Sequence, residues 1–437
     1  MQSSLALFGG SKIRKCGYPP HKTTGEEEKR AVIEVLEKGV LSEFEGTNNE
    51  YFLGGEQVRL LEDEWAHKFG VRYAISFNSA TSALFAAVGA CGVGPGDEVI
   101  VTPYTMSATA TAIIVYNGIP VFADVEMKNY NLDPVSVESR ITDRTKIIFV
   151  VHIFGHPADM DSIMMLAEKH NIMVIEDAAQ APGAFYKGRL AGTIGDIGVY
   201  SLNCNKVIQC GEGGIAVTNS DDLAGRLRLI RNHAEAVIAA GKHVDSLVNM
   251  IGWNYRMNEI EAAISREQLK KMDMLNEKRL SLVHYLNEKL CSFEGLSIPN
   301  VEKDCTHVYY RYALKLDTKK IGIKAPLFVK ALNAEGMDFY VSYMKPLYLQ
   351  PIYQEQIGFG KQGCPFKCPL YKGVVDYKRG ICPNAEKLED IVISTEMVRP
   401  PQTFEDMDEI ADAIKKVIKN RDELIKYENE KQGCNNE

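Results

Sequence analysis

The sequence predicts an α/β protein with a mainly parallel sheet flanked by helices, followed by a smaller α/β domain. Apolar runs typical of buried strands, such as Val121–Val125 and Lys146–Val151, alternate with helix-compatible segments such as Asp133–Arg140, a pattern that favours crossover connections and parallel pairing. The chain has 437 residues, more than the roughly 250–300 residues that one hydrophobic core usually covers. A hydrophobic fraction of 45% can fill two cores.

Individual segments support this division. Gly25–Lys38 and Gln57–Phe69 carry apolar residues at helical spacing, and Ala74–Leu84 combines a short strand, a turn and a helix start. We expect a long helix over Glu259–Glu288 at the domain change. Near the end of the chain, a helix over Thr403–Lys419 should open with a capping box that joins its first residue to Asp406 and should bury an apolar stripe.

Charge and targeting signals exclude some classes of function. The net charge of −8 and the pI of about 5.7 argue against nucleic acid or an anionic membrane as the main partner. The N-terminal apolar segment is too short for a signal peptide, and its basic residues follow it. Since no apolar run approaches the roughly 20 residues of a membrane helix, we expect a soluble cytoplasmic protein.

The ten cysteines are scattered, which does not suggest a disulfide framework in a large acidic chain. Cys364, Cys368 and Cys382 form the one cluster. A zinc site would require a fourth soft ligand, and neither histidine nor cysteine provides it nearby at zinc-finger spacing. Ordinary buried or surface thiols are therefore favoured over metal binding, and we expect no metal.

The most informative stretch starts at an apolar run, Ile172–Ile175, that ends in two acids, Glu176 and Asp177. In an open parallel sheet, ligands bind at the carboxyl ends of the strands. Lys206 lies downstream, between the strand-like run Ile197–Ser201 and a cluster of glycines. Pyridoxal phosphate requires a lysine for its Schiff base and an acid beside its ring nitrogen. Acids and lysines are common surface residues, so this pair alone does not decide the matter.

Three further segments decide whether this pair forms a cofactor site, because their order and spacing resemble the sugar aminotransferases that make amino sugars and aminocyclitols. They are EDAAQAPGAFYKG, GTIGDIGVYS and NKVIQCGEGGIAVTN. These aminotransferases form the DegT/DnrJ/EryC1/StrS family of fold-type I pyridoxal phosphate enzymes. The resemblance implies a large cofactor-binding domain over residues 31–270, with a mainly parallel seven-stranded sheet, and a small C-terminal domain over 271–437. We expect residues 1–30 to pack on the small domain.

The resemblance also implies roles for individual residues. Lys206 would form the covalent link to the cofactor, and Asp177 would pair with the pyridine nitrogen. Gln180 would lie near the 3-oxygen of the ring, and Ser201 would help to bind the phosphate. These four positions match the family motifs.

Two further motifs concern the phosphate and the ring. NSATSAL could be an ordinary helix cap, but it matches the phosphate-binding turn of the family and assigns phosphate contacts to Ala80 and Thr81. Met106 occupies the position at which relatives usually have an aromatic ring that stacks on the pyridine. A thioether can also contact a π face. Tyr104 could replace it only if the strand end is twisted unusually.

The block GWNYRMNEIEAAISREQLKKM also resembles the family, in which the residue equivalent to Asn254 reaches the phosphate of the neighbouring subunit. We therefore expect a homodimer with shared active sites. His152 and His156 follow a strand and lie toward the ligand edge, where a structural role is more common than contact with substrate. Tyrosines within YVSYMKPLYLQPIYQEQ could line the acceptor pocket, although core packing explains such residues equally well.

The implied function is transfer of an amino group from glutamate or glutamine to a ketosugar, ketocyclitol or keto-sugar acid in amino-sugar and polysaccharide biosynthesis. Two alternatives stay open. A dehydratase relative uses the same scaffold but has histidine in place of the lysine, so Lys206 argues against it. A non-catalytic cofactor-binding regulator is also conceivable, although the acid, the lysine and the phosphate turn are all present and no DNA-binding segment is added.

Overall fold

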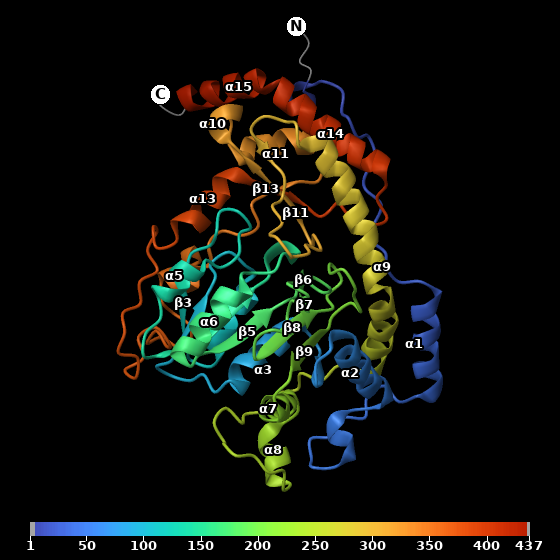
Figure 1. Cartoon of the computed structure of the whole chain (residues 1–437), viewed down its shortest axis with the longest axis vertical. Coiled ribbons are helices and arrows are strands. Elements are labelled where there is room, and N and C mark those ends of the chain that lie inside the picture. The colour runs from blue at the N-terminus through green and yellow to red at the C-terminus, as the bar shows by residue number, and fades with distance from the viewer. Residues whose placement is uncertain (1–4, 435–437) are drawn as a thin grey trace.

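The computed structural model describes residues 5–434 and divides the chain around two sheets (Figure 1). The larger sheet has seven strands in the order β1-β9-β8-β5-β4-β2-β3. Strands β8, β5, β4, β2 and β3 pair in parallel, whereas β9 is antiparallel to both β8 and β1. This confirms the mainly parallel seven-stranded sheet. Its strands are β1 (Tyr73–Phe77), β2 (Glu98–Val101), β3 (Ile119–Phe122), β4 (Thr145–Val151), β5 (Met173–Asp177), β8 (Ile197–Ser201) and β9 (Gly214–Thr218).

Helices cover both faces of this sheet. Alternate strand residues enter opposite cores: Val99 and Val101 pack with α3, α4 and α7, whereas Ile100 packs with α5 and α6, as the period of two in a strand requires. A further cluster joins α2 and α9 to the β8–β9 end. The helices of this part are α1 (Glu26–Lys38), α2 (Glu56–Phe69), α3 (Ala80–Ala90), α4 (Ser107–Val115), α5 (Pro134–Glu138), α6 (Met160–His170), α7 (Asp221–Arg231), α8 (Ala234–Ala239) and α9 (Glu259–Leu290).

The second sheet is antiparallel, with strand order β10-β11-β13-β12. Its core receives α11, α14 and the C-terminal half of α9. Its strands are β10 (Leu296–Ser297), β11 (Tyr312–Leu316), β12 (Tyr340–Val341) and β13 (Val392–Thr395), and its helices are α10 (Thr318–Ile321), α11 (Ala325–Ala334), α12 (Pro351–Gln354), α13 (Pro383–Ile391), α14 (Phe404–Lys419) and α15 (Arg421–Cys434). A two-stranded hairpin, β6 (Phe185–Tyr186) and β7 (Arg189–Leu190), follows β5 in the chain.

Helix α9 runs along one side of the molecule in Figure 1, from α1 and α2 at one end to α14 at the other. The expected change of domain at residue 270 therefore falls inside one continuous helix. The N-terminal segment reaches the second sheet's core, where Leu5 is buried and the backbone N–H of Ala6 donates to Glu335 Oε1 at 2.8 Å. The capping box of α14 is present, with Thr403 and Asp406 bonded reciprocally.

Candidate active site

Two adjacent acids end β5, and the first of them is part of the structure's buried polar framework. Glu176 is fully buried. Its Oε1 accepts hydrogen bonds from the backbone N–H groups of Ile194 and Gly195, both at 2.6 Å, and its Oε2 accepts from Gly192 N at 2.8 Å and His152 Nε2 at 2.9 Å. Burial alone would raise the pKa of Glu176, but these donors overcome it and the pKa is lowered. Glu176 is therefore a satisfied structural carboxylate.

His152 has no free ring nitrogen for a substrate. Its ring is fully buried, and Ala158 N–H donates to Nδ1 at 3.1 Å, so the neutral tautomer carries its proton on Nε2 and donates to Glu176. His156 is also buried, and its Nε2 accepts from Glu302 N at 3.1 Å. Both histidines therefore have structural roles, which was the commoner of the two expectations.

Asp177 is almost as buried as Glu176, with 5% of its surface exposed, but its surroundings differ. It accepts hydrogen bonds from Thr109 Oγ1 at 2.8 Å and from Ala179 N at 3.1 Å. Neither of these donors, a hydroxyl and a backbone N–H, carries a positive charge. Burial raises the pKa of Asp177, and the two hydrogen bonds and the charge of Lys206 offset this only in part. A buried, incompletely compensated carboxylate favours a cationic N–H partner.

Thr109 was not identified from the sequence. It is the third residue of α4, which begins at Ser107 after Met106 as N-cap, and its hydroxyl donates to Asp177 at the end of β5. The signal available was a hydroxyl residue on the buried face of the helix that follows β2, a strand separated from β5 by β4. The sequence alone does not show that β5 and the start of α4 meet at the same edge.

Lys206 lies in the loop between β8 and β9. Its Nζ is 4.2 Å from the centroid of the Tyr310 ring, a cation–π contact. Its charge is among the causes that act on the pKa of Asp177, so the amine and the carboxylate lie within electrostatic reach of each other. Tyr310, which precedes β11 and is buried, was missed as a site residue, because only the fold brings the second sheet to this loop.

Ala80, Thr81 and Ser201 meet at a second corner of the site. Ala80 and Thr81 are the first residues of α3, whose N-cap Ser79 accepts from Ser82 N. Their own N–H groups therefore precede the first intrahelical bonds and are available to an anion. Ser201, at the end of β8, pairs in register with Gly214. A Cβ on Gly214 would lie 2.5 Å from Ala80 N, so only glycine lets β9 approach the start of the helix this closely.

Gln180 lies in the loop after β5 and is 4% exposed. Its Oε1 accepts from Phe154 N at 2.7 Å, and its Nε2 donates to the hydroxyl of Tyr343 at 3.3 Å. The backbone of Phe154 thus orients the amide on one side, and the amide contacts Tyr343, just after β12 of the second sheet, on the other. Tyr343 belongs to the tyrosine-bearing segment in which acceptor contacts were expected.

Met106 and Tyr104 have different environments. Met106 is 51% exposed at the start of α4. Tyr104 is fully buried, its hydroxyl lies 2.9 Å from Ser342 Oγ, and its ring packs against Phe154 and Tyr343. Tyr104 is therefore packed within a core.

Asn254 lies on an exposed segment before α9. Its Oδ1 accepts from Arg256 Nε at 2.8 Å, and its carbonyl oxygen accepts from Asn78 Nδ2 at 3.5 Å. Asn78 immediately precedes the α3 cap. Asn254 is thus near the start of α3 and accessible to a second chain.

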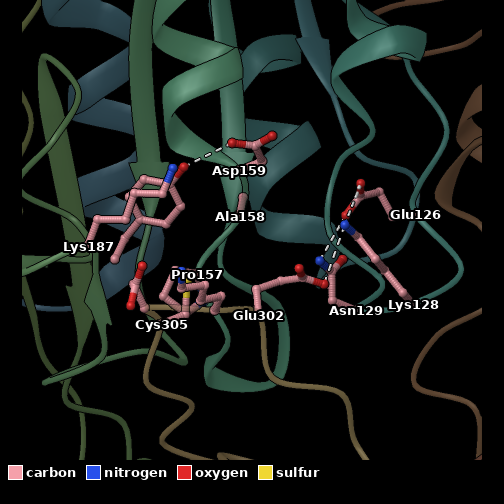
Figure 2. A pocket seen from close by; sticks show the side chains of 12 residues that line it. Glu126, Lys128, Asn129, Pro157, Ala158, Asp159, Lys187, Glu302 and Cys305 are labelled. Carbon is pink, nitrogen blue, oxygen red and sulfur yellow. Dashed lines mark hydrogen bonds and ion pairs between the residues drawn. The ribbon is translucent and has the colours of Figure 1, made fainter.

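A cavity of about 360 Å³ lies at another position, and it contains none of the predicted site residues (Figure 2). Its lining comes from the loops after β3 and β4, the β6–β7 hairpin and residues 302–305. Several of its polar groups pair with one another: Lys128 Nζ lies 3.5 Å from Glu126 and 3.3 Å from Glu302, and the Tyr186 hydroxyl donates to Asp159. Lys187 pairs with Asp161 outside the lining.

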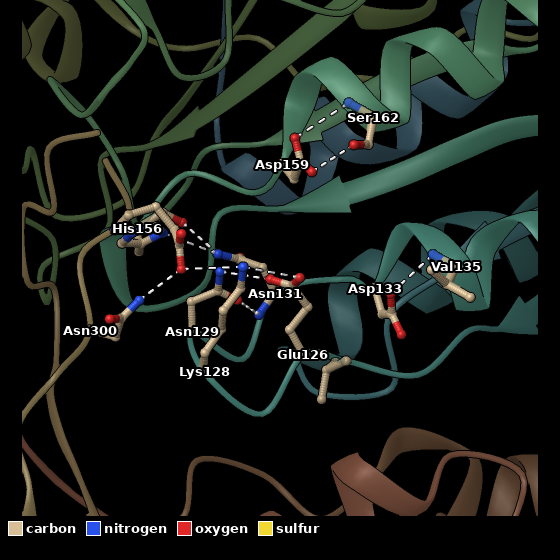
Figure 3. Close-up of polar contacts among 12 residues, drawn as sticks. Glu126, Lys128, Asn129, Asn131, Asp133, Val135, His156, Asp159, Ser162 and Asn300 are labelled. Carbon is tan, nitrogen blue, oxygen red and sulfur yellow. Dashed lines mark hydrogen bonds and ion pairs between the residues drawn. The ribbon is translucent and has the colours of Figure 1, made fainter. Parts of the chain in front are cut away.

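The polar contacts around this cavity hold the loop that precedes α6 (Figure 3). Asn131 Nδ2 donates to the carbonyl oxygens of His156 and Pro157, both at 3.1 Å, and Asp159 caps α6 by bonding Ser162. The cavity wall is therefore a structural framework.

No group of three or more histidine, cysteine, aspartate or glutamate side chains in residues 5–434 is arranged to hold a metal ion. None of the helices in the described range has the length and apolar character needed to cross a membrane. Cys382 is buried, whereas Cys364 and Cys368 are partly exposed, and all three are free thiols.

The side chains present fit pyridoxal phosphate. Asp177 is a buried carboxylate that lacks a cation, the start of α3 has unbonded N–H groups beside a glycine-dependent close approach, and Lys206 is an amine within reach of the acid. When bound, the cofactor supplies an electron sink for the carbon that exchanges its amino group. The fold and the site together define a fold-type I pyridoxal-phosphate-dependent enzyme.

Comparisons with known proteins identify the family. The profile of the DegT/DnrJ/EryC1/StrS aminotransferase family matches residues 24–366. The chain is 32% identical over 403 residues to the spore coat polysaccharide biosynthesis protein SpsC of Bacillus subtilis, with 91% of this chain and 96% of that protein covered. It is 30% identical over 435 residues to L-glutamine:scyllo-inosose aminotransferase of Streptomyces griseus, with 96% and 99% covered.

A solved structure agrees with this assignment. The aminotransferase from Psychrobacter cryohalolentis superposes with a TM-score of 0.79 at 30% identity, over 92% of this chain and 99% of that one. The chain therefore belongs to the DegT/DnrJ/EryC1/StrS aminotransferase family, and it is a pyridoxal-phosphate-dependent aminotransferase.

Proposed function

We propose that this protein moves an amino group from glutamine or glutamate to the carbonyl of a ketosugar, ketocyclitol or keto-sugar acid, with Lys206 and Asp177 as its catalytic residues. The observation that carries the proposal is the combination of a buried carboxylate with a raised pKa and an amine whose charge acts on it. The similarity to an L-glutamine:scyllo-inosose aminotransferase over nearly the whole of both chains supports glutamine as donor and a ketocyclitol-like acceptor.

Each site residue has a distinct task in this proposal. Lys206 would hold the cofactor covalently, and its free amine would be the group that accepts and donates the proton. Asp177 would face the pyridine nitrogen as a carboxylate and favour the protonated form of that nitrogen. Thr109 orients Asp177 through its 2.8 Å hydrogen bond. Gln180 would position the ring oxygen, since its amide is oriented from the backbone of Phe154.

The phosphate is assigned to the start of α3 and to Ser201. The N–H groups of Ala80 and Thr81 would donate to its oxygens, and the helix dipole favours its charge. Asn254 is proposed to contact the phosphate held by a second copy of the chain, because it is exposed and adjacent to the segment that leads into α3. The functional unit would then be a homodimer. Met106, half-exposed at the start of α4, is proposed to lie against the ring.

The alternatives are less well supported. In the dehydratase relatives, histidine replaces the lysine, and this chain has Lys206. A cofactor-binding regulator would not require an amine and a buried acid within electrostatic reach of each other. Neither alternative explains the similarity to named aminotransferases over 91% or more of the chain.

The test is the Lys206→Ala variant, incubated with cofactor and L-glutamine. We expect the visible absorbance of covalently bound cofactor and all donor turnover to disappear, because no other amine lies beside Asp177 in this assignment. The matched control is Lys372→Ala, which removes an exposed lysine and should leave both unchanged. Transamination at the normal rate by Lys206→Ala would contradict the proposal, as would a wild-type protein that binds cofactor without consuming donor.

A further inference from the structure

The amine of Lys206 faces an aromatic ring from the segment that leads into β11. Its Nζ lies 4.2 Å from the centroid of the Tyr310 ring, and Tyr310 is 6% exposed. Lys206 itself is partly buried, whereas the two residues before it, Cys204 and Asn205, are exposed. The contact therefore joins a loop of the first sheet, whose tip is in solvent, to a buried ring beside the second sheet.

The backbone of the Lys206 loop has a separate anchor. Arg399 Nη1 donates to the carbonyl oxygen of Asn205 at 3.4 Å, and Arg399 Nη2 lies 3.4 Å from Glu396. Glu396 also pairs at 2.6 Å with Arg311, the residue that follows the ring. The second sheet's side of the molecule thus contacts this loop twice, at its backbone through an arginine and at its amine through the tyrosine.

The position of the ring follows from an unusual backbone conformation one residue earlier. Tyr309 has a φ of 50°, in the left-handed region that favours glycine. Its N–H donates to His307 Nδ1 at 3.0 Å, the His307 ring stacks on its ring with centroids 3.7 Å apart, and its carbonyl oxygen accepts from Arg279 at 2.8 Å. A residue other than glycine keeps such a conformation where its surroundings determine it, and such residues cluster at functional sites.

A glycine in the loop after β4 lets this segment come close to the first sheet. Val308 N donates to the carbonyl oxygen of Gly155 at 3.0 Å. Gly155 has a φ of +97°, and a Cβ there would lie 2.9 Å from the carbonyl oxygen of Gln180 and 3.1 Å from Tyr309 N. Because a larger residue would force these segments apart, the approach that places the ring on Lys206 depends on this glycine.

An aromatic face is a suitable neighbour for an amine that exchanges protons. The π face attracts an ammonium group, but it has no lone pair that takes the proton and makes no directional bond that must break when the amine turns. A carboxylate in its place would form a charge-assisted hydrogen bond with a preferred geometry. The ring therefore holds the amine in position and leaves its proton free to move.

We propose that Tyr310 is a positioning residue that holds the free amine of Lys206 on its ring face, so that the amine stays directed at the space beside Asp177 whenever it is not bound to the cofactor. This inference rests on the proposed function of Lys206, because a lysine that is released and recaptured in each cycle needs a defined resting position. The hydroxyl of Tyr310 has no part in this role. Phenylalanine should therefore replace the residue, and an aliphatic side chain should not.

The first experiment uses cofactor-free protein and measures how fast trinitrobenzenesulfonate labels Lys206, read by mass spectrometry of the peptides. Labelling of the exposed Lys372 in the same molecule is the internal reference. Because an ammonium group held on the ring does not attack the reagent, Tyr310→Leu should raise the ratio of the two labelling rates about 5- to 10-fold, on the scale of a cation–π contact. Tyr310→Phe should keep the wild-type ratio.

Leucine also changes access to the amine, so a second series keeps the shape of the ring nearly constant. Phenylalanines with one, two and three ring fluorines at position 310 withdraw electron density from the π face in steps. The labelling ratio should rise with each fluorine, since the attraction between a cation and the ring is electrostatic. An equal ratio in all three proteins would show that the ring only fills space and would overturn the proposal.

The second experiment follows the donor half-reaction of the cofactor-loaded enzyme in single turnover, with L-glutamine and with L-glutamine deuterated at its α-carbon. A displaced amine slows proton transfer, so Tyr310→Leu should lower the limiting rate about 10-fold with an unchanged half-saturating concentration of donor. Deuterium should slow this variant more than it slows the wild type. Tyr285→Leu, which removes a ring packed on Phe404, is the matched control and should react as the wild type does.

The outcomes separate the positioning role from the proposed function. If Lys206→Ala still transaminates, the proposed function is wrong, whereas the labelling ratio still reports on the contact in cofactor-free protein. If Lys206→Ala is inactive and Tyr310→Leu keeps the wild-type labelling ratio, limiting rate and isotope effect, the positioning role is wrong and the tyrosine is a packing residue. If Tyr310→Leu does not fold, the fluorinated series decides, because it keeps the ring.

Discussion

Glu176 and Asp177 are neighbours at the end of one strand, but their hydrogen-bond partners differ and their pKa values shift in opposite directions. Four donors surround Glu176, including three backbone N–H groups from residues 192–195, and its pKa is lowered. Two donors reach Asp177, and its pKa is raised. Successive strand residues point to opposite faces of a sheet. Glu176 points toward the backbone N–H groups of residues 192–195, whereas Asp177 points to the other face, where the charge of Lys206 acts on it.

Burial alone does not distinguish the structural acid from the acid that is proposed to be catalytic. Both carboxylates are almost completely inaccessible, yet one is fully paired within the protein and the other lacks a cation among the described residues. A structural acid should affect stability when it is changed, and a functional acid should affect rate. The predictions below use this difference.

The largest expected effect is on rate, in Asp177→Asn. The amide cannot hold the ring nitrogen in its protonated form, so we expect turnover to fall by about 100-fold or more, on the scale of removing one preorganised electrostatic partner, while cofactor still binds through Lys206. Steady-state turnover and cofactor absorbance measure the two parts. An unchanged rate would show that Asp177 is not the partner of the ring nitrogen.

The next effect is on stability, in Glu176→Gln, which leaves buried N–H donors facing an amide NH₂. We expect the free energy of unfolding to drop by about 3 kcal/mol, with turnover per folded molecule retained. Because the pKa of Glu176 is lowered from 4.5, its stabilising contribution is complete above pH 4.5 and is lost as the pH falls through the folded-state pKa. Denaturant unfolding at several pH values tests both the size and this sign.

Asp177→Asn should have the opposite effect on the stability of the cofactor-free protein. Its pKa is raised above 3.8, so protonation favours the folded state, an advantage present below pH 3.8 and lost as the pH rises through the folded-state pKa. At neutral pH the ionised acid is a cost, and replacing it should stabilise the cofactor-free protein by about 1 kcal/mol. If both acid variants destabilised it equally, the contrast between the two residues would be wrong.

The smaller of the two effects on rate is expected for Thr109→Val, which removes one of the two hydrogen bonds that hold Asp177. Loss of a bond to a charged group should reduce turnover by about 10-fold and raise the pKa of Asp177 further. Thr111→Val is the matched control on the same helix, because the Thr111 hydroxyl bonds only to the carbonyl oxygens of Ser107 and Ala108. Equal losses in the two variants would assign the effect to α4 rather than to Asp177.

Much of this protein could be read from its sequence because the relevant signals are local. Alternating apolar runs and helical segments indicate the α/β class, and the glycine-rich and acidic motifs indicate the family. The catalytic roles of Asp177 and Lys206 stay predictions. The Thr403 capping box is equally local, since its partners are three residues apart. Local spacing constrains such features whatever the rest of the chain does.

Only the tertiary structure decided which of two adjacent acids is paired, that Thr109 supports Asp177, and that Arg311, Glu396 and Arg399 meet beside the Lys206 loop. These contacts join residues up to 194 positions apart in the chain. They depend on strand order, on register and on the way the second sheet packs over the first. Hydrogen bonds and charges act over a few ångströms of space, and the separation of two residues along a sequence does not determine that distance.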